Sequence, residues 1–329
     1  MAKPRVTVCI PVYNLENYIA ETLDSLKAQT YQDYEAIIVN DGSKDSSEKV
    51  IAGYLDDPRF KYIYQENKGL AGARNTALAA AEGEWFAQLD GDDIWLPRKL
   101  ELQIALADSD PKANMIYGNL IQFREDGWEN VGYSDSEMPE GDITPNLYFS
   151  NFLCGSSLMV KTEELRALGG YPIQALGEDY TLWLRFARRG IWAKACKEPV
   201  VRYRIRANSL LSARLPNLRA QVVIMEEALS HEDRPHFARI LRRGIERIKW
   251  AETYECARVA AKGGEGDIEK LLWEAWGHRR SDYRRLGMAL VCTLSRLIHV
   301  RQGREFVARM LRNSRTNYEI AEQTPPASS

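Results

Sequence analysis

The most constraining feature of this 329-residue sequence is an alternation of short apolar runs and amphipathic segments across its first 110 residues. Each run is rich in β-branched or aromatic side chains, which favours a buried strand, and each following segment repeats apolar residues at helical spacing. The expected strands are Val6–Ile10, Glu35–Val39, Lys61–Tyr64 and Trp85–Leu89, and the expected helices are Glu16–Gln29, Ser46–Leu55, Leu70–Ala81 and Pro97–Leu106. This alternation predicts βαβ units and an α/β fold, with a mostly parallel sheet flanked by helices.

Beyond residue 112 the alternation loosens, and after Pro216 only helical periodicity remains. Expected elements are the strands Met115–Phe123, Ser156–Val160 and Val200–Ile205, a loop or hairpin over a site at Asp126–Thr144, the helix Glu178–Arg189, and the C-terminal helices Ala220–Leu229, Phe237–Val259, Ile268–Trp276, Asp282–Ile298 and Glu305–Leu311. We therefore expect an α/β domain over 1–212, divided into 1–110 and 111–212. A helical region over 213–315 and a disordered tail over 316–329 follow.

The charge of the chain is unevenly distributed. Residues 1–200 hold 20 basic and 31 acidic side chains, a net charge of −11, whereas residues 201–329 hold 24 basic and 15 acidic ones, a net charge of +9. Such asymmetry predicts two regions that face different partners. The acidic first part, together with the lack of a nucleic-acid-binding motif, argues against a nucleic-acid partner.

Several classes of protein are excluded by composition. No run approaches the roughly 18 apolar residues that indicate a membrane-spanning helix, and the N-terminus does not resemble a signal peptide. The expected location is therefore the cytoplasm, either free or peripheral on the inner face of the membrane. The five cysteines are scattered without a CxxC pair, and all four histidines lie beyond residue 230. A disulfide framework, a zinc cluster and histidine-based chemistry in the first 200 residues are not expected.

Polar and turn-forming residues follow each of the first four expected strands. The segments are Pro11-Val12-Tyr13-Asn14, Asn40-Asp41-Gly42-Ser43, Glu66-Asn67-Lys68-Gly69 and Asp90-Gly91-Asp92-Asp93. Ligands of open α/β sheets bind beyond the carboxyl ends of the strands, so these segments are expected to gather at one site. Each segment alone is equally consistent with an ordinary turn, since Asp and Gly are common turn residues.

The Asp90–Asp93 segment places three carboxylates within four residues. Hard oxygen ligands of this kind suit Mg²⁺ or Mn²⁺, which would in turn hold a diphosphate; the alternative is a solvated acidic turn. Asp41 can accept the imide N–H of uracil, and Tyr13 can stack on a base or lie half-buried at a strand end. Arg74 can reach phosphate, hold Asp90, or remain a solvated helix charge.

Glu178 and Asp179 open a predicted helix directly after Gly177. Carboxylates in the first turn of a helix interact favourably with its dipole, so a capping role is one interpretation. The other is that one of the pair serves as a catalytic base, which requires a carboxylate held near an acceptor hydroxyl.

These segments together resemble glycosyltransferase family 2, the inverting nucleotide-sugar transferases with the Rossmann-like GT-A fold. The resemblance covers about residues 4–212 and rests on Pro11-Val12-Tyr13-Asn14, Asp41-Gly42-Ser43 with Asp45, Asn67-Lys68-Gly69 with Ala73-Arg74-Asn75, Asp90-Gly91-Asp92-Asp93, and Glu178-Asp179 with Leu182 and Arg185. It implies that a sugar moves from a nucleotide-sugar, with UDP favoured, to a hydroxyl of a glycan or lipid-linked acceptor. This is expected to serve polysaccharide biosynthesis at the cell envelope.

The resemblance also implies a role for each matching residue. The nucleoside pocket would be lined by Pro11, Val12 and Tyr13, with Glu16 near it and Asp41 binding uracil. Donor and diphosphate would be held by Asn67, Lys68, Arg74 and Asp90, and the metal, Mn²⁺ or Mg²⁺, by Asp92 with Asp90. Asp179 would be the general base of a single in-line displacement, supported by Glu178, and the configuration at the anomeric carbon would invert.

One segment departs from the family pattern. Many members carry a histidine after the last strand, linked to metal or diphosphate, and Arg206 stands there in this sequence. An arginine does not ligate a metal but pairs well with a diphosphate. We therefore expect Arg206 to close over the phosphates with Ser209 or Ser212 nearby, and the neighbouring Arg202 and Arg204 are expected to serve the same phosphates.

The C-terminal helical region lies outside the resemblance. Its basic cluster consists of Arg279, Arg280, Arg284, Arg285, Arg296, Arg301 and Arg304, interleaved with apolar residues. Such a surface predicts peripheral docking on an anionic membrane, binding of an anionic glycan or a homo-oligomer contact. The alternative is a helical bundle with a solvated basic face.

Two other functions compete with sugar transfer. A metal-dependent nucleotidyltransferase is also an α/β enzyme with metal-binding carboxylates, but the Glu178-Asp179 pair and the lack of an early Gly-rich basic phosphate loop disfavour it. A non-catalytic nucleotide-sugar-binding scaffold would be expected to carry a damaged motif, whereas Asp90, Asp92 and Asp179 are all present.

Overall fold

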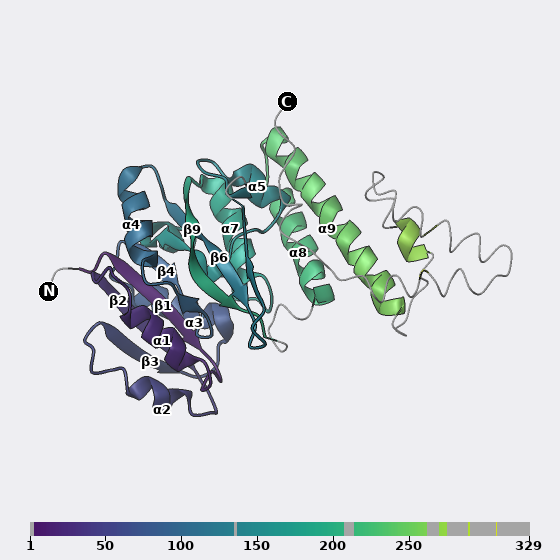
Figure 1. Ribbon diagram of the computed structural model, residues 1–329. Coiled ribbons are helices and arrows are strands. Elements are labelled where there is room, and N and C mark those ends of the chain that lie inside the picture. The colour runs from purple at the N-terminus through teal and green to yellow at the C-terminus, as the bar shows by residue number, and fades with distance from the viewer. Residues whose placement is uncertain are drawn as a thin grey trace. The chain divides into compact units, whose positions relative to one another are not determined.

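The computed structural model describes residues 3–134, 137–206, 214–261, 270–274, 289 and 307. The chain divides into two units, the first running to residue 209 and the second beginning at residue 210 (Figure 1). The expected helices after residue 275 and the expected tail over 316–329 lie outside the described residues, apart from single positions. Within the described part of the chain, no helix combines the length and apolar character needed to cross a membrane.

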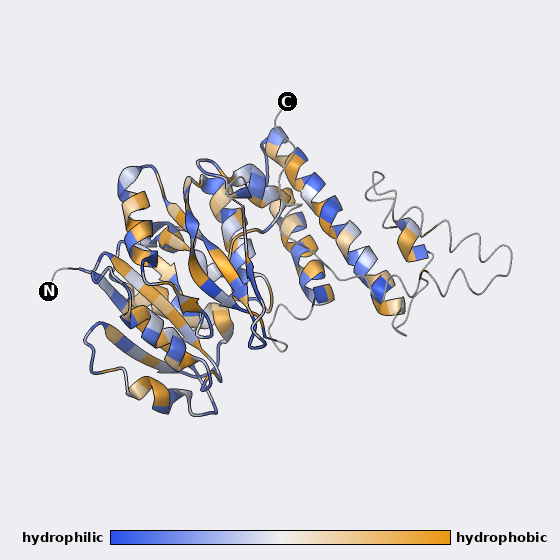
Figure 2. Cartoon of the chain, viewed as in Figure 1, coloured by the Kyte–Doolittle hydropathy of each residue, from blue (hydrophilic) through white to orange (hydrophobic). Residues whose placement is uncertain are grey.

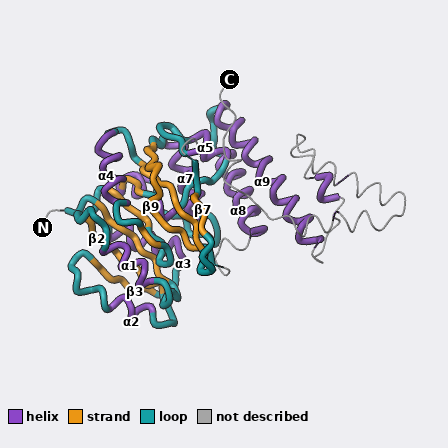
Figure 3. The backbone as a smooth tube through the Cα atoms, in the orientation of Figure 1, coloured by secondary structure: helices purple, strands orange, loops and turns teal. Residues whose placement is uncertain are grey.

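A single mixed sheet forms the centre of the first unit (Figure 3). Its strand order is β3-β2-β1-β4-β8-β6-β9-β5, with β7 paired to β6. Its strands are β1 (Val6–Val12), β2 (Tyr34–Asp41), β3 (Phe60–Gln65), β4 (Trp85–Gln88), β5 (Ile94–Trp95), β6 (Met115–Phe123), β7 (Glu129–Val131), β8 (Met159–Lys161) and β9 (Ala193–Arg204). The flanking helices are α1 (Ile19–Lys27), α2 (Ser47–Ala52), α3 (Gly69–Ala80), α4 (Lys99–Ser109), α5 (Thr144–Phe149), α6 (Thr162–Ala167) and α7 (Glu178–Arg189). The α/β prediction is confirmed.

The directions of the strands bring their carboxyl ends to one edge. Strands β1, β2, β3 and β4 are mutually parallel, as the sequence predicts. Strand β8 runs antiparallel to both β4 and β6, so β6 points the same way as β4, and β9 is parallel to β6. The turns that follow β1, β2, β4, β6 and β9 therefore all lie at the same edge of the sheet.

Burial explains why the first strands form. Every residue of β1 and β2 is buried, as expected for parallel strands covered on both faces. Figure 2 shows that much of this sheet is coloured as hydrophobic. The core around them includes the fully buried indoles of Trp85 and Trp95.

The segment expected as the strand Ser156–Val160 is split in the structure. A 3₁₀ turn, Gly155–Ser157, precedes the shorter strand β8. Its serine side chains explain the difference, because Ser157 Oγ donates to the Cys154 carbonyl and Ser156 Oγ donates to Asp93. Such local side-chain bonds compete with strand pairing.

The second unit contains the helices α8 (Arg214–Ser230) and α9 (Pro235–Ala261), which confirm two of the expected C-terminal helices. The two helices pack against each other through buried residues such as Met225 and Leu241. Ion pairs join Arg219 to Glu252 and Lys249 to Glu226 across the pair.

Candidate active site

The acidic turn after β4 is packed tightly against the end of β1. The Asp93 amide donates to the Asp90 carbonyl at 3.0 Å, which closes the turn. A Cβ on Gly91 would lie 2.8 Å from Leu15 Cδ1 and 3.0 Å from the Pro11 carbonyl oxygen. A larger side chain at this position would crowd the end of β1, so Gly91 lets the turn lie close against that strand.

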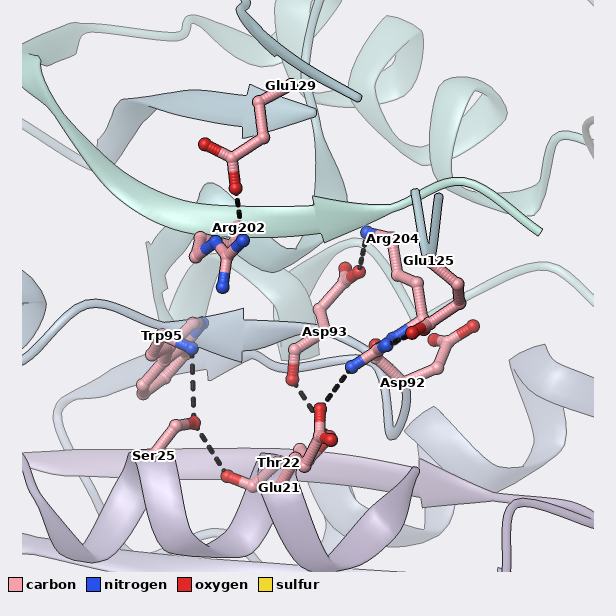
Figure 4. A network of polar contacts seen from close by, with 10 residues as sticks. All are labelled: Glu21, Thr22, Ser25, Asp92, Asp93, Trp95, Glu125, Glu129, Arg202 and Arg204. Carbon is pink, nitrogen blue, oxygen red and sulfur yellow. Dashed lines mark hydrogen bonds and ion pairs between the residues drawn. The ribbon is translucent and has the colours of Figure 1, made fainter. Parts of the chain in front are cut away.

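The third carboxylate of the turn, that of Asp93, has a structural role. It is 1% exposed, accepts the Ser156 hydroxyl at 2.5 Å and accepts the Arg204 backbone N–H at 2.9 Å. The Asp93 carbonyl accepts from Thr22 of α1 (Figure 4). Burial, with the neighbouring charges of Asp92 and Asp90, raises the pKa of Asp93 well above its ordinary value. Asp93 therefore ties the turn to β9 and α1.

Arg204, at the end of β9, braces the same turn from the other side. Its Nε donates to the Asp92 carbonyl at 2.8 Å, and its two terminal nitrogens pair with Glu21 and Glu125 (Figure 4). The expectation that Arg202 and Arg204 serve phosphates finds no support here, because Arg202 pairs with Glu129 and the Arg204 side chain, 3% exposed, is committed to protein partners. Sequence reasoning missed this brace, although the two-residue spacing of the arginines along a strand was its one visible signal.

Arg74 joins the acidic turn to the start of α7. One terminal nitrogen donates to Asp90 Oδ1 at 2.9 Å and the other to Glu178 Oε1 at 2.7 Å. Its side chain is 4% exposed and lies against the Tyr171 ring. Burial alone lowers the pKa of Arg74, but the charges of Asp90 and Glu178 raise it above its ordinary value. Of the roles considered for Arg74, the one seen is that of holding Asp90.

Glu178 and Asp179 begin α7 after Gly177, whose φ of +70° places it in the left-handed region. Glu178 is buried and Asp179 is half-buried. Burial raises the pKa of both carboxyl groups, and the Arg74 charge opposes that rise. A carboxylate with a raised pKa is a stronger proton acceptor, which suits a general base.

Arg206 contacts the remaining aspartate of the turn. Its terminal nitrogen lies 2.6 Å from Asp92 Oδ2, and its guanidinium lies 5.2 Å from the centre of the Tyr18 ring. Burial and the Asp90 charge raise the pKa of Asp92, and the Arg206 charge lowers it. The Nε of Arg206 is buried without a hydrogen-bond partner in the described residues. Ser209 and Ser212 lie outside those residues.

The expected nucleoside residues lie at the ends of β1 and β2. Pro11 and Val12 are buried, and Tyr13 is 48% exposed. Asp41 is buried, and its Oδ1 accepts from Gln65 Nε2 at 2.6 Å and from the Lys68 amide at 2.8 Å.

Three further candidate residues are exposed and shape the surrounding loops. Glu16 accepts the Ser46 amide at 2.8 Å, and Asn67 accepts the Gly69 amide at 3.1 Å, where α3 begins. Lys68 is exposed beside Asn67. A Cβ on Gly42, whose φ is +74°, would lie 3.0 Å from the Asn67 nitrogen. The turns after β2 and β3 are therefore in close contact.

The acidic turn is chemically suited to a divalent cation. In the part of the chain that the structure describes, no group of three or more His, Cys, Asp and Glu side chains is placed to hold a metal ion. Asp90 and Asp92 each use one oxygen in an arginine contact, through Oδ1 and Oδ2 respectively, and each has a second oxygen. Mg²⁺ in phosphate-transfer sites is commonly bound by one or two carboxylates, with phosphate and water completing its shell. The two aspartates fit that pattern.

The sheet, its acidic turn and the carboxylates that start α7 define a class, the GT-A fold. Within that class the chain belongs to glycosyltransferase family 2. The family model, described as glycosyl transferase family 2, matches residues 7–160. The Escherichia coli protein named UDP-Glc:alpha-D-GlcNAc-diphosphoundecaprenol beta-1,3-glucosyltransferase WfgD is 32% identical over 221 residues, which cover 66% of this chain and 83% of that protein.

Other relatives are longer than this chain. An uncharacterized glycosyltransferase of Rickettsia felis is 35% identical over 194 residues, which are 56% of this chain and 32% of that protein. The chain thus matches about a third of that relative's length.

Solved structures share the fold at low identity. Residues 1–349 of S. aureus TarS, in complex with UDP-GlcNAc, match with a TM-score of 0.60 at 17% identity, over 87% of this chain and 90% of that one. The mannosyltransferase PcManGT from Pyrobaculum calidifontis, in complex with GDP-Man and Mn²⁺, matches with a TM-score of 0.61 at 19% identity, over 94% and 86%.

Proposed function

We propose that this protein is an inverting glycosyltransferase that moves a hexosyl or N-acetylhexosaminyl group from a nucleotide-sugar to a hydroxyl of a glycan or lipid-linked acceptor. The observation that carries the proposal is the Arg74 bridge, in which one buried guanidinium contacts both Asp90 and Glu178. This bridge couples the turn suited to a donor diphosphate to the helix start that offers a base.

The proposed donor is a UDP-sugar. Tyr13 supplies an exposed ring for the base at the end of β1, and Asp41 supplies a buried carboxylate at the end of β2. Asn67 and Lys68 form the loop that Asp41 holds. The UDP-GlcNAc complex of TarS and the UDP-Glc in the name of WfgD agree with this choice, whereas the GDP-Man complex of PcManGT makes GDP the competing nucleotide.

In the proposed reaction, Asp179 removes the acceptor proton as that oxygen attacks the anomeric carbon from the face opposite the nucleotide. Glu178 is held by Arg74 and keeps the helix start in place. The Arg206 guanidinium, whose Nε lacks a partner in the described residues, pairs with the departing diphosphate. A Mn²⁺ or Mg²⁺ ion held by Asp92 and Asp90 would supply further stabilisation of that negative charge. A single displacement inverts the configuration.

The proposed setting is the cytoplasm or the inner face of the membrane, in polysaccharide biosynthesis for the cell envelope. The name of WfgD, which includes a diphosphoundecaprenol-linked acceptor, supports a lipid-linked acceptor for this chain. A nucleotidyltransferase and a non-catalytic scaffold are the competing functions.

A donor screen tests the proposal. We expect release of UDP from one of a panel of UDP-, GDP- and dTDP-sugars with Mn²⁺ or Mg²⁺, and no pyrophosphorolysis. Asp179→Asn should retain UDP affinity and lower turnover by about a hundredfold or more, the usual contribution of a general base. Glu163→Gln, an exposed carboxylate in the first turn of α6, is the matched control and should change neither. Pyrophosphorolysis, or Asp179→Asn turnover equal to that of the unaltered chain, would exclude this function.

A further inference from the structure

The hairpin that follows β6 presents an exposed tryptophan at the site edge of the sheet. Trp128 lies between β6 and β7 and is 39% exposed, in a segment, 124–131, that is exposed throughout. The turn is well defined, because the Arg124 amide donates to the Trp128 carbonyl at 3.0 Å and the Trp128 amide donates to Asp126 Oδ1 at 3.0 Å. The Arg124 guanidinium lies 4.5 Å from the centre of the Trp128 ring. The turn thus holds a partly exposed indole at this edge of the sheet, with the Arg124 guanidinium against it.

Two ion pairs fasten this hairpin to β9, and one of them leads on to the acidic turn. Glu129 pairs with Arg202, and Glu125 pairs with Arg204, the residue that also holds the Asp92 carbonyl (Figure 4). In register, Phe123 at the end of β6 lies beside Arg204 of β9. Trp128 therefore lies three residues after Glu125, and Glu125 pairs with the same arginine, Arg204, that donates to the Asp92 carbonyl.

The chemistry around Trp128 suits a neutral sugar ring. The C–H face of a pyranose packs well on an aromatic face, and carboxylate oxygens accept hydrogen bonds from its hydroxyl groups. Residues 124–131 contain one basic and three acidic side chains, a net charge of −2, which disfavours a phosphate-bearing group at this position.

We propose that Trp128 is a platform for a neutral sugar of the acceptor, on a hairpin fixed to the donor turn through Arg204. This inference rests on the proposed sugar transfer, and it adds that a neutral sugar of the acceptor binds at Trp128. Trp192 provides a matched control, since it is 38% exposed, lies under Lys112 and directly precedes β9, at the opposite edge of the sheet.

The binding test uses the full chain labelled with 5-fluorotryptophan, in the absence of donor. Trp128→Phe and Trp192→Phe assign the two resonances. Methyl glycosides of glucose, galactose, mannose and N-acetylglucosamine are the probes, because all present a pyranose C–H face. We expect saturable shifts of the Trp128 resonance and none of the Trp192 resonance, with no response of Trp128 to inorganic phosphate. A Trp128 resonance that ignores every glycoside, or that moves only with protein concentration, would overturn the platform.

The kinetic test uses the donor that the screen identifies. Trp128→Ala should raise the acceptor KM roughly tenfold, as expected for loss of one stacked aromatic, with the UDP Kd unchanged. Trp128→Phe should restore most of that loss, and Trp192→Ala should change nothing. Because glycoside binding is measured without turnover, a chain that binds glycosides at Trp128 but releases no UDP would refute only the proposed function. Full transfer with an unchanged KM in Trp128→Ala would refute only the platform.

Discussion

At the residue scale, the effect of an arginine on the site depends on how buried its carboxylate partners are. Arg74 contacts Glu178, whose side chain is 9% exposed, and Asp90, whose side chain is 29% exposed. Arg204 contacts Glu21 and Glu125, whose side chains are 58% and 70% exposed. A buried carboxylate that loses its arginine is left as an uncompensated charge in the protein interior, whereas an exposed carboxylate that loses its arginine is solvated by water. Arg74 should therefore tune the electrostatics of the site, and Arg204 should act mainly through geometry.

The first prediction concerns the pH dependence of kcat/KM. Because burial raises the pKa of Asp179, its carboxylate is protonated, and inactive as a base, up to a higher pH than an ordinary aspartate. Activity should therefore fall as the pH drops through a value above the usual 3.9 or so. The Arg74 charge lowers that pKa, so Arg74→Gln should move the acidic limb to higher pH. Arg204→Gln is the control, and an equal movement in both variants would contradict this assignment.

Much of the site could be predicted from the sequence because its residues follow strands directly. The positions of Tyr13, Asp41 and Asp90 at one edge follow from strand order alone. The Arg204 brace could not be predicted, because its partner Glu21 lies 183 residues away along the chain. Sequence spacing fixes which edge a residue reaches, but the pairing of long side chains is decided only by the packed structure.

At the element scale, strands were predictable in proportion to their burial. Strands β1 and β2 are buried along their whole length and were found within a few residues, whereas the two-residue strand β5 is too short for any periodicity. Strand β9 begins seven residues before its expected start at Val200. Near the middle of this strand is Pro199, which lies where the register with β6 shifts between Gly118 and Leu120. A proline in a sequence argues against a strand at that position, because proline is tolerated inside a sheet only where a bulge or an edge accommodates it.

The second prediction tests the brace that β9 provides. Arg204→Met removes the bond to the Asp92 carbonyl and frees Glu21 and Glu125 into solvent. We expect UDP affinity in the presence of Mn²⁺ to fall roughly tenfold, the value of one buried charge-assisted hydrogen bond. Arg202→Met removes a neighbouring arginine that does not contact the turn and should leave the UDP Kd unchanged. Isothermal titration calorimetry measures the UDP Kd of both variants. Equal affinities would show that the Arg204 contacts do not contribute to donor binding.

The third prediction concerns the first turn of α4. Lys99 is fully buried, donates to Gln103 Oε1 at 2.6 Å and lies over the Trp95 ring. Burial lowers the pKa of Lys99 to about 7, below its ordinary value. Between that pH and about 10.4 the unfolded chain binds a proton that the folded chain does not, so stability should rise with pH across this window and be flat below it.

Lys99→Met should remove the cost of deprotonating this lysine on folding. The free energy of unfolding at pH 7 should therefore increase by up to about 4 kcal/mol. Urea unfolding between pH 7 and 10 measures the difference between the variant and the unaltered chain. Lys161→Met, at a partly exposed lysine near Trp85, is the control and should leave the slope in place. A difference that does not shrink as the pH rises would show that Lys99 stays charged in the fold.

At the scale of the whole molecule, the two units carry opposite charge. The first 200 residues have a net charge of −11, and part of it lies in the acidic turn, where Arg74 pairs with Asp90 and Arg206 pairs with Asp92. The last 129 residues have a net charge of +9. Helix α9 supplies part of that charge, and the basic cluster between Arg279 and Arg304 lies outside the described residues. If the acceptor is lipid-linked, it lies in a membrane, and an anionic membrane surface is one to which this basic region could bind.

The fourth prediction is that the full chain floats with vesicles containing anionic lipid and does so less at high salt. Each basic residue near such a surface contributes about 1 kcal/mol, so reversing Arg279, Arg284 and Arg285 to Glu should weaken binding by a hundredfold or more. Reversing Arg239, Arg242 and Arg243, which are exposed on α9, is the charge-matched control. If both triple variants lose binding equally, the attraction is a property of net charge alone. If neither loses binding, the basic cluster does not dock on membranes, and a contact between copies of the chain becomes the better explanation of its charge.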